Sequence, residues 1–183
     1  AVEYGTGDDP ERRRRWCADC HDIDFGDCIL YSYGGGSAME IGHEFRCDLV
    51  ENVRFHDIDI LAVHQYGSAF SIRNADGAVI RNVTYERIRV EHHYNELIGF
   101  RILRSRYSRS AEPGRAENIV LRDCDIAISI YNPGYTVSHC GGPAPGRSFH
   151  GVRFDQVRLN GKVATCIEDF DLYTRHATDI SFA

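Results

Sequence analysis

The chain has 183 residues, a length that fits one domain of ordinary size. Hydrophobic residues make up 43% of it and charged residues 26%, which excludes the compositions of disordered and collagen-like chains. The formal net charge is −6 and no apolar run approaches the roughly 18 residues that cross a bilayer. We therefore expect neither nucleic acid nor a membrane as a partner.

A short strand is predicted at residues 1–5, and it is the first of a series. Alternating apolar residues predict similar strands at 38–42, 69–73 and 99–103. Successive side chains of a strand point to opposite faces, so each strand directs a polar residue outward. Equivalent strands stacked about 4.8 Å apart bring these residues into one column. We expect this column to contain Glu3, Glu40, Ser71 and Arg101.

Two further motifs follow the first predicted strand. The basic run 12–15 lies in an otherwise acidic chain, so we expect a solvated loop there, with the rim of a ligand cleft as the alternative. The motif Cys17-Ala-Asp-Cys20-His21 has the form of a c-type haem attachment site, and together with Cys47 it could form a zinc site. A strand follows it directly and a second Cys-x-x-Cys is missing, so we expect no metal and no cofactor.

A phrase of about nine residues then recurs along the chain, with clear copies at 22–30, 52–60, 82–90 and 118–126 and weaker copies at 151–159 and 179–182. The copies begin 30, 30, 36, 33 and 28 residues apart. Apolar and polar residues alternate within each copy, which predicts strand with one buried face. A polar pair, such as His56-Asp57, interrupts the alternation and predicts a bend between two short strands.

Two strands per period and no helix predict an all-β chain, a right-handed parallel β-helix of about six coils that forms a single domain over residues 1–183. A β-sandwich would place tight hairpins about every 8 to 12 residues, and a leucine-rich repeat would show its Leu pattern and a helix. The sequence has neither feature. Long loops at 105–115 and 132–147 are candidate walls of a substrate site.

Repeated residues inside the phrase predict how the coils are held together. Asn52, Asn82 and Asn118 occupy the same position, just before a strand, where we expect a structural ladder of stacked asparagines. Cys28 and Cys124 share an apolar position, where a free cysteine packs as a small core residue. The seven cysteines are an odd number without the dense spacing of a disulfide framework, so we expect packing rather than cross-links.

The stretch Gly36-Ser-Ala-Met-Glu-Ile-Gly-His-Glu44, followed by Asn52-Val-Arg-Phe55 and Phe70-Ser-Ile-Arg-Asn74, resembles consecutive coils of polygalacturonase-like glycoside hydrolases and their dextranase-like relatives. The resemblance covers nearly the whole chain and rests mostly on the repeated strand pattern of the scaffold. It implies an enzyme that hydrolyses a polysaccharide without an organic cofactor and is secreted or periplasmic. The family's Arg-Ile-Lys falls on Ser71-Ile72-Arg73, which favours a relative acting on another glycan.

The same resemblance implies where the family's paired aspartates lie. They precede a strand that ends in Gly, and residues 1–5 match the end of that strand. The resemblance thus places the aspartates upstream of Ala1 and makes this chain the C-terminal part of a longer β-helix. An open coil at that end would expose a strand edge, so we also expect self-association or an N-terminal β-helix segment as a partner.

Independently of the family, glycoside hydrolysis needs an acid and a second carboxylate roughly 5 to 9.5 Å apart. The candidate catalytic residues on the outward face are Glu3, Glu40 and Glu44, and Glu3 and Glu40 lie one coil apart in the predicted column. The candidate substrate-binding residues are Arg73, Asn74, Asp76, Arg101, His43 and His64. We further expect exposed tyrosines beside this face to stack on sugar rings, namely Tyr31, Tyr33, Tyr66 and Tyr94.

Two functions follow from these expectations. The first is a glycoside hydrolase acting on a polysaccharide or oligosaccharide. The alternative is a non-catalytic β-helix that binds glycan or serves as a structural segment, which the absence of the Asp-Asp strand favours. Exposed charges on a solvated sheet also form ladders without any function in binding.

Overall fold

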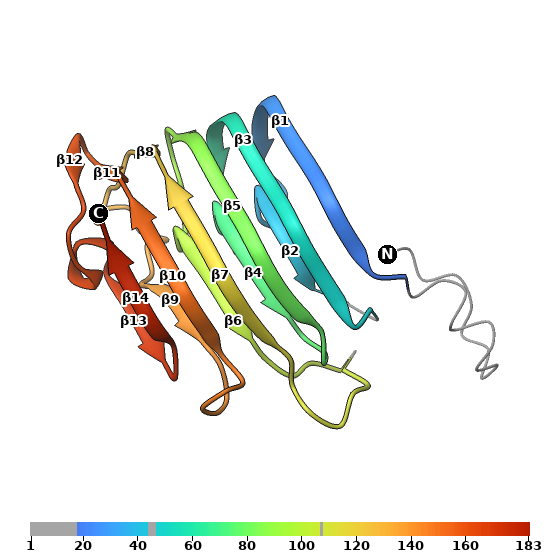
Figure 1. Ribbon diagram of the computed structural model, residues 1–183. Helices are drawn as coiled ribbons and strands as arrows, with labels where there is room; N and C mark the ends of the chain where they lie inside the picture. The colour runs from blue at the N-terminus through green and yellow to red at the C-terminus, as the bar shows by residue number, and fades with distance from the viewer. Residues whose placement is uncertain (1–17, 44–46, 107) are drawn as a thin grey trace.

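The computed structural model describes residues 18–43, 47–106 and 108–183, and it is a parallel β-solenoid of about five turns (Figure 1). Strands account for 57% of the structure and helix for 2%, which confirms the predicted all-β class. The number of turns is about five rather than six, because the last copy of the phrase, 179–182, supplies one strand and not a further coil. No helix in the described part of the chain is long and apolar enough to cross a membrane.

Two sheets form the solenoid and lie as two layers whose strands follow one another from the N-terminal to the C-terminal end (Figure 1). The larger sheet consists of β1 (Cys20–Ser32), β3 (Leu49–Val63), β5 (Val79–Val90), β7 (Arg115–Arg122), β8 (Asp125–Ile126), β10 (Phe149–Asp155), β11 (Arg158–Leu159), β12 (Lys162–Val163) and β14 (Thr178–Phe182). The smaller sheet consists of β2 (Met39–His43), β4 (Phe70–Asn74), β6 (Ile98–Ile102), β9 (Ser138–Gly141) and β13 (Leu172–Arg175). The paired strands run parallel except for β11 and β12.

The strands of the larger sheet bend at residues with a left-handed backbone. Positive φ angles recur once per coil at Asp22, Asn52, Asn82, Asn118 and Gly151, and again five residues later at Asp27, Asp57, Arg87, Asp123 and Gln156; Asp179 repeats the first position in the last copy. Asn and Asp tolerate this region better than other residues with a Cβ atom. The second set confirms the predicted bend at the polar pairs, and the first explains why Asn and Asp recur in the phrase.

The predicted asparagine ladder is confirmed. Asn52 Nδ2 donates to Asp22 Oδ1 over 2.9 Å, Asn82 Nδ2 to Asn52 Oδ1 over 3.0 Å, and Asn118 Nδ2 to Asn82 Oδ1 over 2.8 Å. Asn52 and Asn82 therefore each accept from the following coil and donate to the preceding one, while Asp22 only accepts and Asn118 only donates within the ladder. The ladder fixes the stacking of four coils at one bend.

Stacked rings and aliphatic side chains fill the space between the two sheets. Phe55 and Tyr85 stack with their ring centroids 5.2 Å apart, and Phe100 of the smaller sheet packs against Tyr85 at 6.2 Å and Phe149 at 5.5 Å. Cys124 is buried and Cys28 is half-buried against the same core, which confirms their predicted packing role. Burial raises the pKa of the Cys124 thiol to about 12, so this thiol stays protonated at neutral pH.

The two ends of the described solenoid differ. At the C-terminal end the 3₁₀ helix η1 (Ile167–Phe170) places Phe170 against Phe154, with the ring centroids 4.5 Å apart, and closes the core. At the end formed by β1, Ile23 and Phe25 are 44% and 42% exposed although their strand positions face the core. Apolar side chains therefore remain open to solvent at that end.

Two sequence predictions about the smaller sheet were wrong. Arg101 was expected opposite Ser71, but it lies opposite Arg73, and Ser71 is fully buried opposite Gly99. A shift of two residues keeps every side chain on its face, and the sequence Ile98-Gly-Phe-Arg-Ile102 offers apolar residues in either register. The loop predicted at 132–147 contains strand β9, whose sequence Ser-His-Cys-Gly lacks the alternating apolar residues of the other strands.

Candidate functional site

The outer face of the smaller sheet carries two columns of residues that run from coil to coil. The first column is Glu40, Ser71, Gly99, His139 and Tyr173. The second column is Gly42, Arg73, Arg101, Gly141 and Arg175. The residues between them, such as Ile72 and Phe100, point into the core. Polar and aromatic side chains thus gather on one rigid, flat surface, which we call the small-sheet face.

A buried carboxylate organises the centre of the small-sheet face. Glu96 precedes β6 and its side chain is only 4% exposed. Arg101 Nη2 donates to Glu96 Oε2 over 2.6 Å, and Arg73 Nη2 lies 3.3 Å from Oε1. Ser68 Oγ donates to the same Oε1 over 2.8 Å. One acid between two guanidinium groups leaves a net positive charge and fixes the direction of the remaining N–H donors.

Gly99 makes room for this carboxylate. A Cβ atom at position 99 would lie 2.4 Å from Ser68 Oγ and 2.7 Å from Glu96 Oε1. The carboxylate therefore rests directly on the backbone of β6, between the two arginines. No residue with a side chain fits at this position without displacing Glu96.

Replacing Gly99 with Ala is expected to displace Glu96 while leaving the fold intact, because the obstructing atoms belong to side-chain ends and not to backbone. Arg73 and Arg101 then lose a charge-assisted partner worth about 1.5 to 3 kcal/mol per hydrogen bond, reduced by their partial exposure. A crystal structure of Gly99→Ala checks the displacement, and circular dichroism checks the fold. An unmoved Glu96 would contradict the assignment of this role to Gly99.

The C-terminal end of the small-sheet face carries aromatic rings. His139 and Tyr173 are neighbours in the first column with their ring centroids 5.3 Å apart, and Tyr173 is 53% exposed. Burial, followed by the charge of Arg101, lowers the pKa of His139 below its ordinary value. His139 is therefore neutral at neutral pH and can donate or accept a hydrogen bond.

The structure brings three of the predicted site residues together on the small-sheet face. Arg73 and Arg101 are direct neighbours across β4 and β6, and Glu40 lies on β2 in the other column, half-buried. His43 lies at the end of β2, opposite Asn74. His64 lies apart from them, in the turn that follows β3.

Asn74 and Asp76 hold a turn of the scaffold. Asn74 is buried and its Nδ2 donates to the carbonyl oxygen of Ala78 over 2.6 Å. The carboxylate of Asp76 accepts from the backbone N–H groups of Gly77, Arg109 and Ser110. Burial raises the pKa of Asp76, but these hydrogen bonds outweigh it, and the pKa lies below its ordinary value. Asn74 therefore holds the turn between β4 and β5, and Asp76 anchors the loop that follows β6 to that turn.

Two candidate acids, Glu3 and Glu44, lie outside the described residues, and so does Cys17. The distance between Glu3 and Glu40 therefore stays a prediction. Within residues 18–43, 47–106 and 108–183, no group of three or more His, Cys, Asp or Glu side chains is arranged to hold a metal ion.

Sequence reasoning missed Ser68, Glu96, His139 and Tyr173. A signal for the first two existed, because Ser68 stands five residues before Arg73 and Glu96 stands five residues before Arg101. The two turns thus repeat the same spacing between a polar residue and an outward arginine. For His139 no signal existed, because the sequence of β9 lacks the alternating apolar residues that predict a strand.

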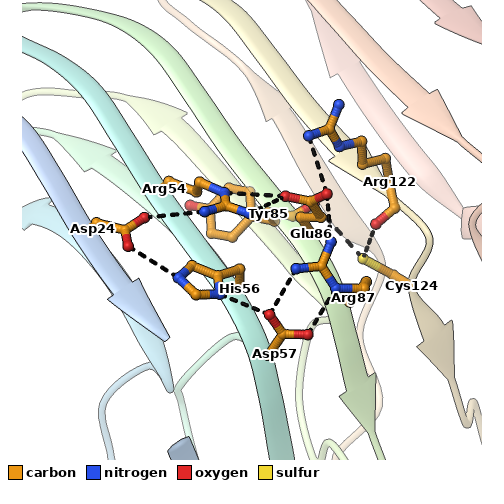
Figure 2. A network of polar contacts seen from close by, with 9 residues as sticks. All are labelled: Asp24, Arg54, His56, Asp57, Tyr85, Glu86, Arg87, Arg122 and Cys124. Atoms are coloured by element: carbon orange, nitrogen blue, oxygen red, sulfur yellow. Dashed lines mark hydrogen bonds and ion pairs between the residues drawn. The ribbon is translucent and has the colours of Figure 1, made fainter. Parts of the chain in front are cut away.

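A second polar network lies on the larger sheet (Figure 2). Glu86 is 9% exposed and binds Arg54 Nη2 at 2.7 Å, Arg87 Nη1 at 2.5 Å and Arg122 Nη2 at 3.1 Å. His56 links two coils, with Nδ1 2.8 Å from Asp57 Oδ2 and Nε2 3.1 Å from Asp24 Oδ2. Each of these charged side chains pairs with a neighbouring side chain of the network, and several pairs join adjacent coils, so we assign the network to the cohesion of the coils.

Searches against protein-family models, curated proteins and solved structures each gave no match to this chain.

Proposed function

We propose that this protein is carbohydrate-active and that the small-sheet face binds a polysaccharide or oligosaccharide. The observation that carries the proposal is the pair of guanidinium groups on Arg73 and Arg101, which Glu96 holds side by side on adjacent coils. Guanidinium groups donate in a fixed planar geometry that suits hydroxyl and carboxylate oxygens. The exposed ring of Tyr173 adds an apolar surface on which a sugar can rest.

For the reaction we propose glycoside hydrolysis, with Glu40 as one of the two carboxylates. Glu96 is unsuited to this task, because it is buried and already accepts from three side chains. Glu40 is partly accessible on the same face, beside Ser71 of the next coil. The second carboxylate is then Glu3 or Glu44, as the sequence suggests. We further propose that the protein is secreted or periplasmic and acts on its substrate there.

One observation favours the alternative of a non-catalytic glycan-binding protein. Among the ten residues of the two columns, Glu40 is the sole carboxylate in the part of the chain that the structure describes. Hydrolysis requires two carboxyl groups, whereas binding requires none. The experiment must therefore measure binding and bond cleavage separately.

The test compares wild type with Arg73→Ala, Glu40→Gln and the control Arg153→Ala on a panel of plant and microbial polysaccharides. Arg153 is paired with Asp155 on the larger sheet, away from the proposed face. We expect Arg73→Ala to weaken glycan binding about 10-fold or more, and Arg153→Ala to leave it unchanged. Binding assays measure the dissociation constant and reducing-sugar release measures cleavage.

The outcomes separate the two functions. Cleavage by wild type that is lost in Glu40→Gln supports the hydrolase. Binding without cleavage by wild type supports the non-catalytic alternative. If wild type binds no polysaccharide of the panel, or if Arg73→Ala binds as tightly as wild type, the proposed face is wrong.

A further inference from the structure

Five aromatic side chains form a strip along three successive coils, which we call the aromatic strip: Tyr31, Tyr33, His64, His92 and Tyr94. They come from the ends of β1, β3 and β5 and from the turns that follow these strands. The ring centroids lie 5.6 Å apart for Tyr33 and His64, and 6.1 Å apart for His64 and Tyr94. His92 lies 5.4 Å from His64, and Tyr31 stacks on Tyr33 at 6.1 Å. One or two rings therefore stand on each coil.

Backbone hydrogen bonds hold the strip in register. The N–H of His64 donates to the carbonyl oxygen of Ser32 over 2.8 Å, and the N–H of Tyr94 donates to that of Val63 over 2.8 Å. Parallel pairing thus continues beyond the strands into the turns, and it places the rings of Tyr33, His64 and Tyr94 one above another. The main chain therefore fixes the spacing of these residues from coil to coil before any ligand arrives.

The residues of the strip lie outside the core and are exposed or partly exposed to solvent. Tyr31 and Tyr33 are 60% and 67% exposed, and His64, His92 and Tyr94 are half-buried. None of the five belongs to the hydrophobic core cluster or to the side chains packed against it. Exposed aromatic rings gathered on a rigid surface are typical of interaction sites and are not needed for packing.

The chemistry of the strip fits sugar rings. A pyranose presents a face of C–H groups and a rim of hydroxyls, which match an aromatic face and the polar tips of Tyr and His. Single-stranded nucleic acid also stacks on aromatic rings, but the strip contains no Lys or Arg to neutralise phosphates, and the chain carries a net charge of −6.

A turn of the chain links the strip to the small-sheet face. The turn that begins at His64 runs through Tyr66 into β4, and Arg73 Nη2 lies 3.5 Å from the carbonyl oxygen of Tyr66. We infer that the aromatic strip is a second binding strip, which holds uncharged sugar units of a glycan running along the solenoid axis. This inference rests on the proposed function, because both surfaces would serve one ligand.

The experiment uses a polysaccharide that wild type binds, and it compares Tyr33→Ala, His64→Ala, Arg73→Ala and the control Tyr131→Ala. Tyr131 is 90% exposed and lies outside the strip. We expect Tyr33→Ala and His64→Ala each to weaken binding about 5- to 10-fold, and Tyr131→Ala to leave it unchanged. Tyr33→Phe keeps the ring and should bind within about 2-fold of wild type. Thermal unfolding of each variant confirms that the chain is folded.

Each outcome decides for or against the strip. Weaker binding by Tyr33→Ala and His64→Ala with intact folding supports the strip. If Arg73→Ala also binds as tightly as wild type, the strip is still supported and only the small-sheet face is wrong. Binding that is lost in Arg73→Ala but unchanged in both strip variants overturns the strip and leaves the proposed face standing. If wild type binds no glycan, both the proposed function and the role of the aromatic strip are wrong.

Discussion

Replacing Phe100 with Ala is expected to lower the free energy of unfolding by about 3 to 5 kcal/mol. The ring is fully buried and contacts Tyr85 of the larger sheet and Phe149 of a later coil. Truncation removes the apolar area of the ring and leaves a cavity that stacked strands cannot close, because hydrogen bonds to both neighbouring coils fix β6. Urea unfolding followed by circular dichroism measures the change.

The matched control is Tyr173→Ala, which removes a ring of similar size from the surface of the same sheet. Tyr173 is 53% exposed, so its loss should change the free energy of unfolding by less than about 1 kcal/mol. Each coil contacts only its neighbours, so loss of one core ring should weaken its own coil and the interfaces with the adjoining coils. Equal stabilities of Phe100→Ala and wild type would show that the two sheets do not share this core.

Acid is expected to destabilise the solenoid through Glu86. Burial raises the pKa of this carboxyl, but hydrogen bonds and charges from Arg54, Arg122 and Arg87 outweigh it and lower the pKa to about 2, below the ordinary value of 4.5. A depressed folded-state pKa stabilises the fold above the unfolded-state value, and the contribution is lost as pH falls from 4.5 towards 2. The loss amounts to about 1 to 3 kcal/mol, since the arginines are partly exposed and screened.

Glu86→Gln is the control for this prediction. The amide keeps the size of the side chain and does not titrate, so the variant should be less stable at neutral pH and lose less stability in acid. Chemical unfolding at a series of pH values measures both curves. Parallel curves for the variant and wild type would contradict a role for Glu86 in acid sensitivity.

His56 contributes to the same titration with the opposite sign. Hydrogen bonds to Asp57 and then Asp24 raise its pKa above the ordinary 6.5. Its contribution is therefore complete below the unfolded-state pKa and is lost as pH rises through the raised folded-state value. Glu86 and His56 together favour maximal stability in the mildly acidic range between their transitions.

The architecture could be predicted from the sequence because each coil of a solenoid repeats the same pattern of apolar and polar residues. The phrase that begins at Asn52 and Asn82 records both the inward apolar positions of β3 and β5 and the bends between their halves. A left-handed backbone favours Asn and Asp, so turn chemistry and strand pattern coincide once per coil. The pattern is weak in any single copy, but its recurrence in successive coils makes the prediction possible.

The centre of the small-sheet face could be predicted only in part. Outward arginines were recognisable at positions 73 and 101, but their adjacency depends on a register that differs by two residues from the one expected. Phe100 lies opposite Ile72 and Cys140, a pairing that alternation alone does not reveal, because a shift of two residues keeps the same face inward. Glu96 lies in a turn, where no periodic pattern marks it as buried.

The most direct measurement is an NMR titration of the protein with a polysaccharide that it binds, in which the side-chain Nε–Hε resonances of the arginines are followed. Arginine-to-lysine variants provide the assignments. If the small-sheet face holds the glycan, the resonances of Arg73 and Arg101 shift and saturate together, and that of Arg153 on the larger sheet stays in place. Saturable shifts of Arg153 with unmoved Arg73 and Arg101 would contradict the proposed face and place the ligand elsewhere on the solenoid.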